Sequence, residues 1–306
     1  MSPKNRITTA CSALILIWLA VAASISYGAG LGFSSEKIEA VTGLKGSANN
    51  EVFKVTAPRT DVPIYVDGWK MPPFMGLASW AAFTRGKNAD TMVMGDFVLF
   101  QDEVFAVMRA ALTHGLAVTA LHNHFFYDEP RVYFMHIGGE GDAVTLAGGV
   151  RAMLDAVKAV RAAAPKPQTS FGLPALPGEN QITATDIEKI LGVKIQANKG
   201  MAKVVIGRTV TMDCGCEVGA DMGVNTWAGF AGSDDNAVVD GDFAVAEEEL
   251  QPVLKSLTSS GINVVAIHSH MTGEKPRILF LHYWGRGKAS ELATSLKKAL
   301  SAQASV

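Results

Sequence analysis

The chain has 306 residues, of which 48% are hydrophobic and 18% are charged. This composition supports a sizeable buried core and excludes global disorder, and the length suggests about two ordinary domains. The formal net charge is −2, from 27 basic and 29 acidic residues, so there is no basic excess for binding nucleic acid. Three cysteines are too few for a disulfide-stabilised scaffold.

The first 29 residues have the layout of a secretory signal peptide. Lys4 and Arg6 precede an uncharged run, residues 10–25, which is shorter than the ~20 residues of a spanning helix. Small residues at Ser26 and Gly28 predict cleavage near Ala29; an uncleaved anchor helix is the alternative. We expect a secreted or periplasmic protein without stable membrane insertion after cleavage. Its net charge would be −4, with 25 basic and 29 acidic residues left.

The rest of the chain contains two copies of one sequence unit. Residues 95–141 match residues 241–287 without a gap, and 16 of the 47 aligned pairs are identical. A period of 146 residues indicates an internal duplication, because solenoid repeats have periods of about 20–50 residues. We predict repeat units at 30–163 and 181–306, joined by a proline-rich linker at 164–180.

Each repeat combines helices and strands. Apolar residues at helical spacing predict helices over 103–113 and 144–163, and Gly115 ends the first of them. Residues 116–122 and 131–137 are apolar and β-branched, which is typical of strands. The predicted fold class is α+β: an internal duplication of a mostly antiparallel sheet unit with flanking helices. The two units should pack as a pseudo-dimer about an approximate twofold axis.

Six of the seven histidines follow one pattern, His-x-His-x11-His, once in each repeat. Residues i and i+2 of a strand face the same side, about 6.5–7 Å apart. If residues 127–129 form a hairpin tip, residue 120 pairs with residue 136, and His136 lies diagonally from His122. The candidate metal ligands are therefore His122, His124, His136, His268, His270 and His282.

Three imidazoles on one sheet face are a common way to hold zinc, copper, nickel or iron. Two other interpretations stay open: a metal-free polar pocket and ordinary structural burial. The identical spacing in both repeats favours a metal. The seventh histidine, His114, corresponds to Ser260 and is expected at the surface, at a helix end.

Two carboxylates, Asp128 and Glu274, follow the second histidine of each set by four residues. They could supply a fourth ligand, accept an imidazole N–H, or act as a catalytic base. The alternative is a carboxylate that only caps a turn. Asp96 and Asp242 precede a predicted helix and are interpreted as turn residues.

Cys214 and Cys216 occur only in the second repeat, separated by one glycine. In an exported protein they could form a local disulfide, bind a soft metal, or stay reduced.

The residues around the histidines resemble a known family. The first motif is the sequence His-Asn-His-Phe-Phe-Tyr-Asp-Glu-Pro-Arg at residues 122–131. It is followed by Phe-Met-His at residues 134–136 and preceded by Gly-Asp-Phe at residues 95–97, just before the predicted helix. This pattern resembles the LppY/LpqO-like family (domain of unknown function 1259), whose members carry the unit in duplicate. The resemblance implies an exported bacterial protein but no established activity. Several relatives are lipoproteins; this chain lacks a lipobox, so lipid anchoring is not carried over.

Three functional hypotheses follow. The first is an exported protein that binds a transition metal through the two histidine sets and buffers or delivers it. The second is a metal-dependent hydrolase, in which an open coordination position activates water. The third is a metal-free ligand-binding or envelope interaction protein. An enzyme would need a general base close to the metal that is not itself a ligand, whereas a carrier would not.

Overall fold

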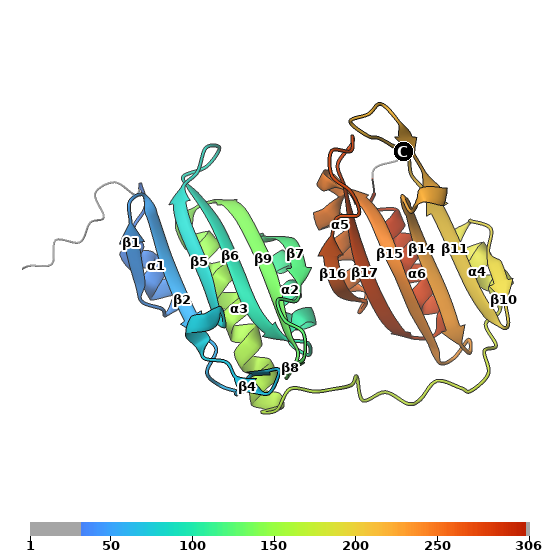
Figure 1. Cartoon of the computed structure of the whole chain (residues 1–306), viewed down its shortest axis with the longest axis horizontal. Helices are drawn as coiled ribbons and strands as arrows, with labels where there is room; N and C mark the ends of the chain where they lie inside the picture. Colours follow the sequence, from blue (N-terminus) through green and yellow to red (C-terminus); the bar gives the residue numbers. More distant parts are fainter. Residues whose placement is uncertain (1–31, 304–306) are drawn as a thin grey trace, which may run out of the picture.

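The computed structural model describes residues 32–303 (Figure 1), so the predicted signal peptide, residues 1–29, lies outside the described part. The first repeat contains, in chain order, α1 (Ser35–Thr42), β1 (Gly46–Asn49), β2 (Val52–Pro58), β3 (Tyr65–Val66), β4 (Trp69–Lys70), η1 (Pro73–Met75), β5 (Ala78–Arg85), β6 (Thr91–Phe100), α2 (Val104–Thr113), β7 (Ala117–His122), β8 (Asp128–Glu129), β9 (Val132–Gly141) and α3 (Ala143–Ala163).

Within the described residues, the second repeat follows the same order, except that it has an additional short 3-10 helix and no counterpart of β8. It contains α4 (Ala184–Leu191), β10 (Gln196–Asn198), β11 (Met201–Gly207), β12 (Val210–Thr211), β13 (Glu217–Val218), η2 (Ala220–Met222), β14 (Asn225–Gly232), β15 (Ala237–Ala246), η3 (Glu247–Glu249), α5 (Leu250–Ser259), β16 (Asn263–His268), β17 (Ile278–Gly287) and α6 (Ala289–Leu300).

Twelve strands form one antiparallel sheet in the order β1-β2-β5-β6-β9-β7-β16-β17-β15-β14-β11-β10. The order is palindromic: each strand of the first repeat and its counterpart in the second lie equally far from the β7–β16 junction. Figure 1 shows these two strands as the ones through which the repeats face each other. The predicted α+β class, internal duplication and pseudo-twofold arrangement are confirmed.

One face of the sheet is covered by helices. Buried side chains of α2, α3, α5 and α6 join residues from both halves of the sheet in one continuous core, which includes Met135 and Ile137 of β9. Side chains alternate along a strand, so His136, between these two residues, points to the other face. We call this other face the histidine face.

Local sequence explains where the central elements begin and end. The helix predicted over 103–113 is α2, with Glu103 as its N-cap. Gly115 adopts a φ of 79°, which favours glycine, and lets the Leu116 N–H donate to the Ala111 carbonyl at 3.0 Å. The strands predicted over 116–122 and 131–137 are β7 and β9, and β9 continues to Gly141.

The two repeats meet along β7 and β16, and α2 packs against α5 on the helix-covered face. Leu121 of β7 pairs with Ile267 of β16, and these two residues are equivalent by the 146-residue offset. Beside them, the Gln251 amide donates to the Val118 carbonyl at 2.8 Å and accepts from the Val118 N–H at 3.0 Å. The pseudo-twofold axis therefore passes between Leu121 and Ile267.

Residues 164–180, the predicted linker, contain neither helix nor strand. Figure 1 shows this segment running from the end of α3 along one edge of the molecule to α4 at the far side of the second repeat. Arg286 and Asn236 hold it by donating to the carbonyls of Pro174 and Ala175. Within residues 32–303, no helix is long and apolar enough to cross a membrane.

Candidate metal centre

The hairpin between β7 and β9 positions the first histidine set. Ala120 pairs with His136 and His122 with Phe134, which confirms the register predicted from the sequence. A bulge lies between Val118 and Ala120, before the histidine-bearing end of the strand. The second repeat repeats this arrangement on β16 and β17, where Ala266 pairs with His282 and His268 with Phe280.

The three imidazoles of each set lie close together. The ring centroid of His122 is 5.1 Å from those of both His124 and His136. In the second repeat the corresponding distances from His268 are 5.1 Å to His270 and 4.9 Å to His282. The structure therefore brings together all six histidines as two sets of three.

A phenylalanine holds the histidine that lies beyond the end of each strand. The His124 ring stacks on Phe134 with centroids 3.4 Å apart and an interplanar angle of 5°. His270 stacks in the same way on Phe280, at 3.4 Å and 8°. This contact orients an imidazole that no strand hydrogen bonds would fix. Because His124 and His270 are exposed, each set is accessible to an ion from solvent.

Sequence reasoning missed one acidic residue in each set. Asp96 and Asp242 were interpreted as turn residues, but they lie inside β6 and β15, directly opposite His136 and His282. The available signal was that both aspartates keep the same 146-residue offset as the histidines. Their long, apolar flanking segments also indicated a strand rather than a turn.

The aspartate joins the imidazoles most closely in the second repeat. Asp242 Oδ2 lies 3.6 Å from His270 Nε2. The ligand atoms of Asp242, His268 and His270 all lie within 4.8 Å of one another, a spacing that could hold a metal ion. Among residues 32–303, the donors of the first repeat are not gathered within that limit.

Each aspartate also has an oxygen that lacks a partner. The Oδ1 atoms of Asp96 and Asp242 are buried and accept no hydrogen bond from any described residue. Burial raises the pKa of both carboxyl groups, an effect that positive charge on His136 and His282 would oppose. An unpaired carboxylate oxygen beside three imidazoles is a donor set that fits a transition-metal cation.

The pKa of one imidazole in each set is lowered, opposite to the shift of the aspartates. Burial lowers the pKa of His124 and His268, and neighbouring histidines of the same set lower it further. Neutral imidazole is the form that binds a metal ion, so the environment favours the ligating state.

The structure places Asp128 and Glu274 in the connections between the paired strands, and both are buried. Asp128 Oδ2 accepts from the Val132 N–H at 2.6 Å, and Glu274 Oε1 accepts from the Ile278 N–H at 3.2 Å. Each carboxylate therefore stabilises the connection in which it lies by accepting a backbone hydrogen bond. Their predicted roles as ligand or catalytic base stay predictions.

Two other predicted features belong to neither set. Cys214 and Cys216 are joined in a disulfide, which is one of the three states expected for them. His114 lies at the exposed end of α2, where its Nδ1 is 2.9 Å from the Ala110 carbonyl oxygen.

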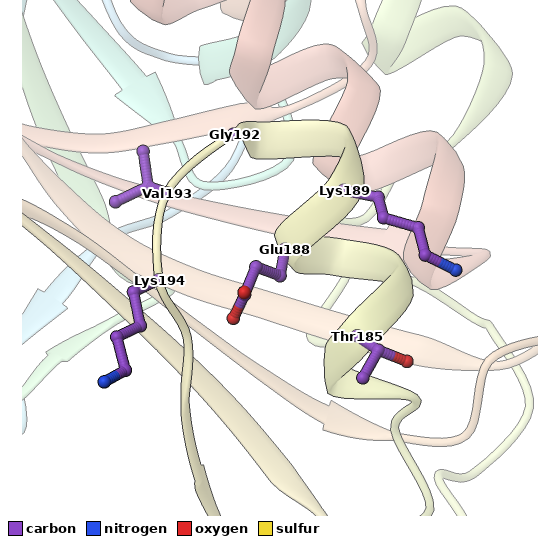
Figure 2. A pocket seen from close by; sticks show the side chains of 6 residues that line it. All are labelled: Thr185, Glu188, Lys189, Gly192, Val193 and Lys194. Carbon is purple, nitrogen blue, oxygen red and sulfur yellow. The ribbon is translucent and has the colours of Figure 1, made fainter.

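A pocket beside α4 (Figure 2) lies at the outer edge of the second repeat, away from the histidines. It is lined by Thr185, Glu188, Lys189, Gly192, Val193 and Lys194. Glu188 accepts from the Ile195 N–H at 3.0 Å, and the two lysine side chains point away from each other in Figure 2. The pocket therefore presents no converging set of reactive groups.

The duplicated Asp–His arrangement coincides with a family match in both repeats. The model of the family described as Domain of Unknown Function (DUF1259) matches residues 36–156 and 185–302. This chain belongs to that family, with the domain present in duplicate. A search of curated proteins found no match.

Solved structures give only weak similarities. The trimeric bacterial microcompartment shell protein PduB is 11% identical over 85% of this chain and 91% of its own, with a TM-score of 0.23. The double-ringed trimeric shell protein MSM0271 from the RMM microcompartment is 11% identical over 82% and 97%, with a TM-score of 0.21. Scores this low support no inference about function.

Proposed function

We propose that this chain is an exported protein that binds one transition-metal ion in each repeat. The first site would consist of Asp96, His122, His124 and His136, and the second of Asp242, His268, His270 and His282. The observation that carries the proposal is the repeated pairing of three clustered imidazoles with a buried aspartate whose second oxygen has no partner.

The chemistry of the donor atoms supports a transition metal. Burying a carboxylate without a partner costs free energy, and a bound cation would offset that cost. Three nitrogen donors and one oxygen donor suit zinc, copper, nickel or iron better than calcium or magnesium, which prefer oxygen ligands. Export rests on the sequence of the first 29 residues. It would place the two sites outside the cytoplasm, where buffering or delivery of a metal is the simplest role.

The carboxylates near the two sites favour a metal-binding role over hydrolysis. A hydrolase would need a general base close to the metal that is not itself a ligand. The two candidate bases, Asp128 and Glu274, instead accept hydrogen bonds from backbone N–H groups of their own turns. Asp96 and Asp242 are assigned here as ligands, so they are not free to serve as the base.

The test is metal stoichiometry of protein purified without a histidine tag. The wild type should hold two ions per chain after loading with Zn²⁺ and desalting, and His124→Ala or His270→Ala should each hold one. His114→Ala is the matched control and should keep both ions, because His114 belongs to neither set. A wild type without bound metal, or a His124→Ala variant that still binds two ions tightly, would refute the proposal and favour a metal-free ligand pocket.

A further inference from the structure

The register at the junction places the two sets in shared rows across the sheet. Asp96 pairs with His136, and His136 with Ala120. Continuing the Leu121–Ile267 pairing by one residue places Ala120 opposite His268 and His122 opposite Ala266. The second row then runs from His122 through Ala266 to His282 and Asp242.

Only two small side chains separate the sets within these rows. Leu121 and Ile267 point into the helix-covered core, so their neighbours Ala120 and Ala266 point to the histidine face. Each alanine lies between a histidine of one set and a histidine of the other. The floor between the two sites therefore carries the methyl groups of Ala120 and Ala266, both partly exposed, and it is bordered by His122 and His268, which lie diagonally across the junction from each other.

The spacing across this floor suits a small bridging molecule. Neighbouring strands lie about 4.8 Å apart, so His136 and His268, two strands apart in one row, are separated by roughly 10 Å at Cα. Ions held at the centres of the two sets would lie on the order of 10–15 Å apart. This separation is too long for one shared atom but matches a short extended molecule.

The net charge of the two metal sites indicates which charged groups such a molecule would carry. A divalent ion with three neutral imidazoles and one aspartate leaves a net charge of about +1 at each site. A ligand with one negative charge at each end would match both sites at once. A metal ion that accepts five or six ligands would keep an open coordination position at each site for one end of this ligand.

We propose that the two metal sites share one ligand, a small linear dianion that binds one metal ion at each end and crosses Ala120 and Ala266. This inference rests on the proposed function, since the sites must first hold metal. It assigns to the junction between the repeats a role that neither repeat could perform alone.

The test uses the full chain loaded with two Ni²⁺ ions, because Ni²⁺ accepts up to six ligands. Isothermal titration calorimetry would measure binding of linear α,ω-dicarboxylates of increasing length, with hexanoate as the monocarboxylate control. The expected result is one dicarboxylate per chain, an optimum in chain length, and affinity roughly 100-fold above that of hexanoate, as expected for two linked binding events.

Substitutions at the floor separate bridging from independent binding. Ala120→Leu should keep two nickel ions and lose at least about tenfold in dicarboxylate affinity, because the larger side chain obstructs the path. Val265→Leu is the matched control; Val265 is exposed on the same junction but outside the two rows, and this variant should bind as the wild type does.

Metal content is measured before dicarboxylate binding, so a failure of the metal sites can be distinguished from a failure of the shared ligand. A chain that holds no Ni²⁺ would overturn the shared ligand, and a chain that holds neither Ni²⁺ nor Zn²⁺ would overturn both proposals. A chain that holds two ions would overturn the shared ligand alone if it binds no dicarboxylate. The same conclusion follows if two dicarboxylates bind per chain without dependence on length.

Discussion

Asp242 on β15 lies directly opposite His282 on β17, and its carboxylate approaches the ring of His270 to 3.6 Å. These residues come from three separate segments, and only the register of the antiparallel sheet brings them together. The same register joins Asp96 to His136 in the first repeat. The site is therefore a product of strand pairing rather than of a local motif, and its acidic member is the most informative residue to change.

Asp242→Asn should weaken Zn²⁺ binding to the second site by at least about tenfold, because the amide cannot replace a charged carboxylate ligand. The metal-free variant should be at least as stable as the wild type, since the substitution removes a buried carboxylate oxygen without a partner. Zinc titration and thermal unfolding of the apo-protein measure the two effects. Asp240→Asn, at an exposed position of the same strand, is the control. A stability loss without an affinity loss would count against the ligand role.

The raised pKa values of Asp96 and Asp242 predict a pH dependence of the metal-free fold. A carboxyl group with a higher pKa in the folded chain holds its proton more tightly there. Its contribution to stability therefore decreases as pH rises from about 4 through the raised pKa. Urea unfolding of the apo-protein across this range should show the decrease. The Asp96→Asn/Asp242→Asn double variant should show less of it, and parallel profiles for the two proteins would contradict the assignment.

Metal affinity itself should fall in acid. The ligating imidazoles must be neutral, and the lowered pKa values of His124 and His268 move their protonation below the ordinary value of about 6.5. Competitive zinc titrations between pH 5 and 8 should therefore show little change near neutrality and a steep loss of affinity below about pH 6. Affinity independent of pH over this range would exclude histidine as the main ligand.

A buried ion pair at the start of α5 is a separate test of the fold. Arg208 contacts both carboxylate oxygens of Glu249 at 2.8 Å. Burial would raise the pKa of Glu249, but the hydrogen bonds from Arg208 and the Ala246 N–H more than offset it, so the pKa is lowered. Arg208→Met should destabilise the protein by about 3–5 kcal/mol by leaving a buried charge unpaired. Arg151→Met, at the exposed pair with Asp155, should cost no more than about 1 kcal/mol in the same denaturation experiment.

The junction between the repeats depends on one side chain that is not duplicated. Gln251 makes two hydrogen bonds to the Val118 backbone, and its counterpart in the first repeat is Phe105. Gln251→Ala should cost about 1–3 kcal/mol, because two buried backbone groups lose their partner. Gln196→Ala, on the exposed edge strand β10, should leave the unfolding free energy within about 0.5 kcal/mol of the wild type. Equal effects of the two substitutions would argue against a specific contact at the junction.

Much of the fold could be predicted because it depends on local patterns and on the duplication. Apolar spacing indicated α2 within one residue of its observed start, and Gly115 indicated its end. The proposed hairpin gave the correct pairing of Ala120 with His136. These features require only residues that are close in sequence.

The aspartates were missed because their role depends on pairing that is distant in sequence. Asp96 lies 40 residues before His136, and α2, β7 and β8 lie between the strands that carry them. A glycine before it and a helix after it made a turn the natural interpretation. Likewise, no local pattern could indicate that β7 and β16 join the two halves of the sheet, because the paired residues Leu121 and Ile267 are 146 residues apart in the sequence.

The most direct test of the central claim is a crystal structure of the zinc-loaded protein with anomalous diffraction data collected at the zinc edge. We predict two anomalous peaks related by the pseudo-twofold axis, one bound by Asp96, His122, His124 and His136 and the other by Asp242, His268, His270 and His282. Peaks only at other positions, such as His114, or no peak in fully loaded crystals, would contradict the two-site account.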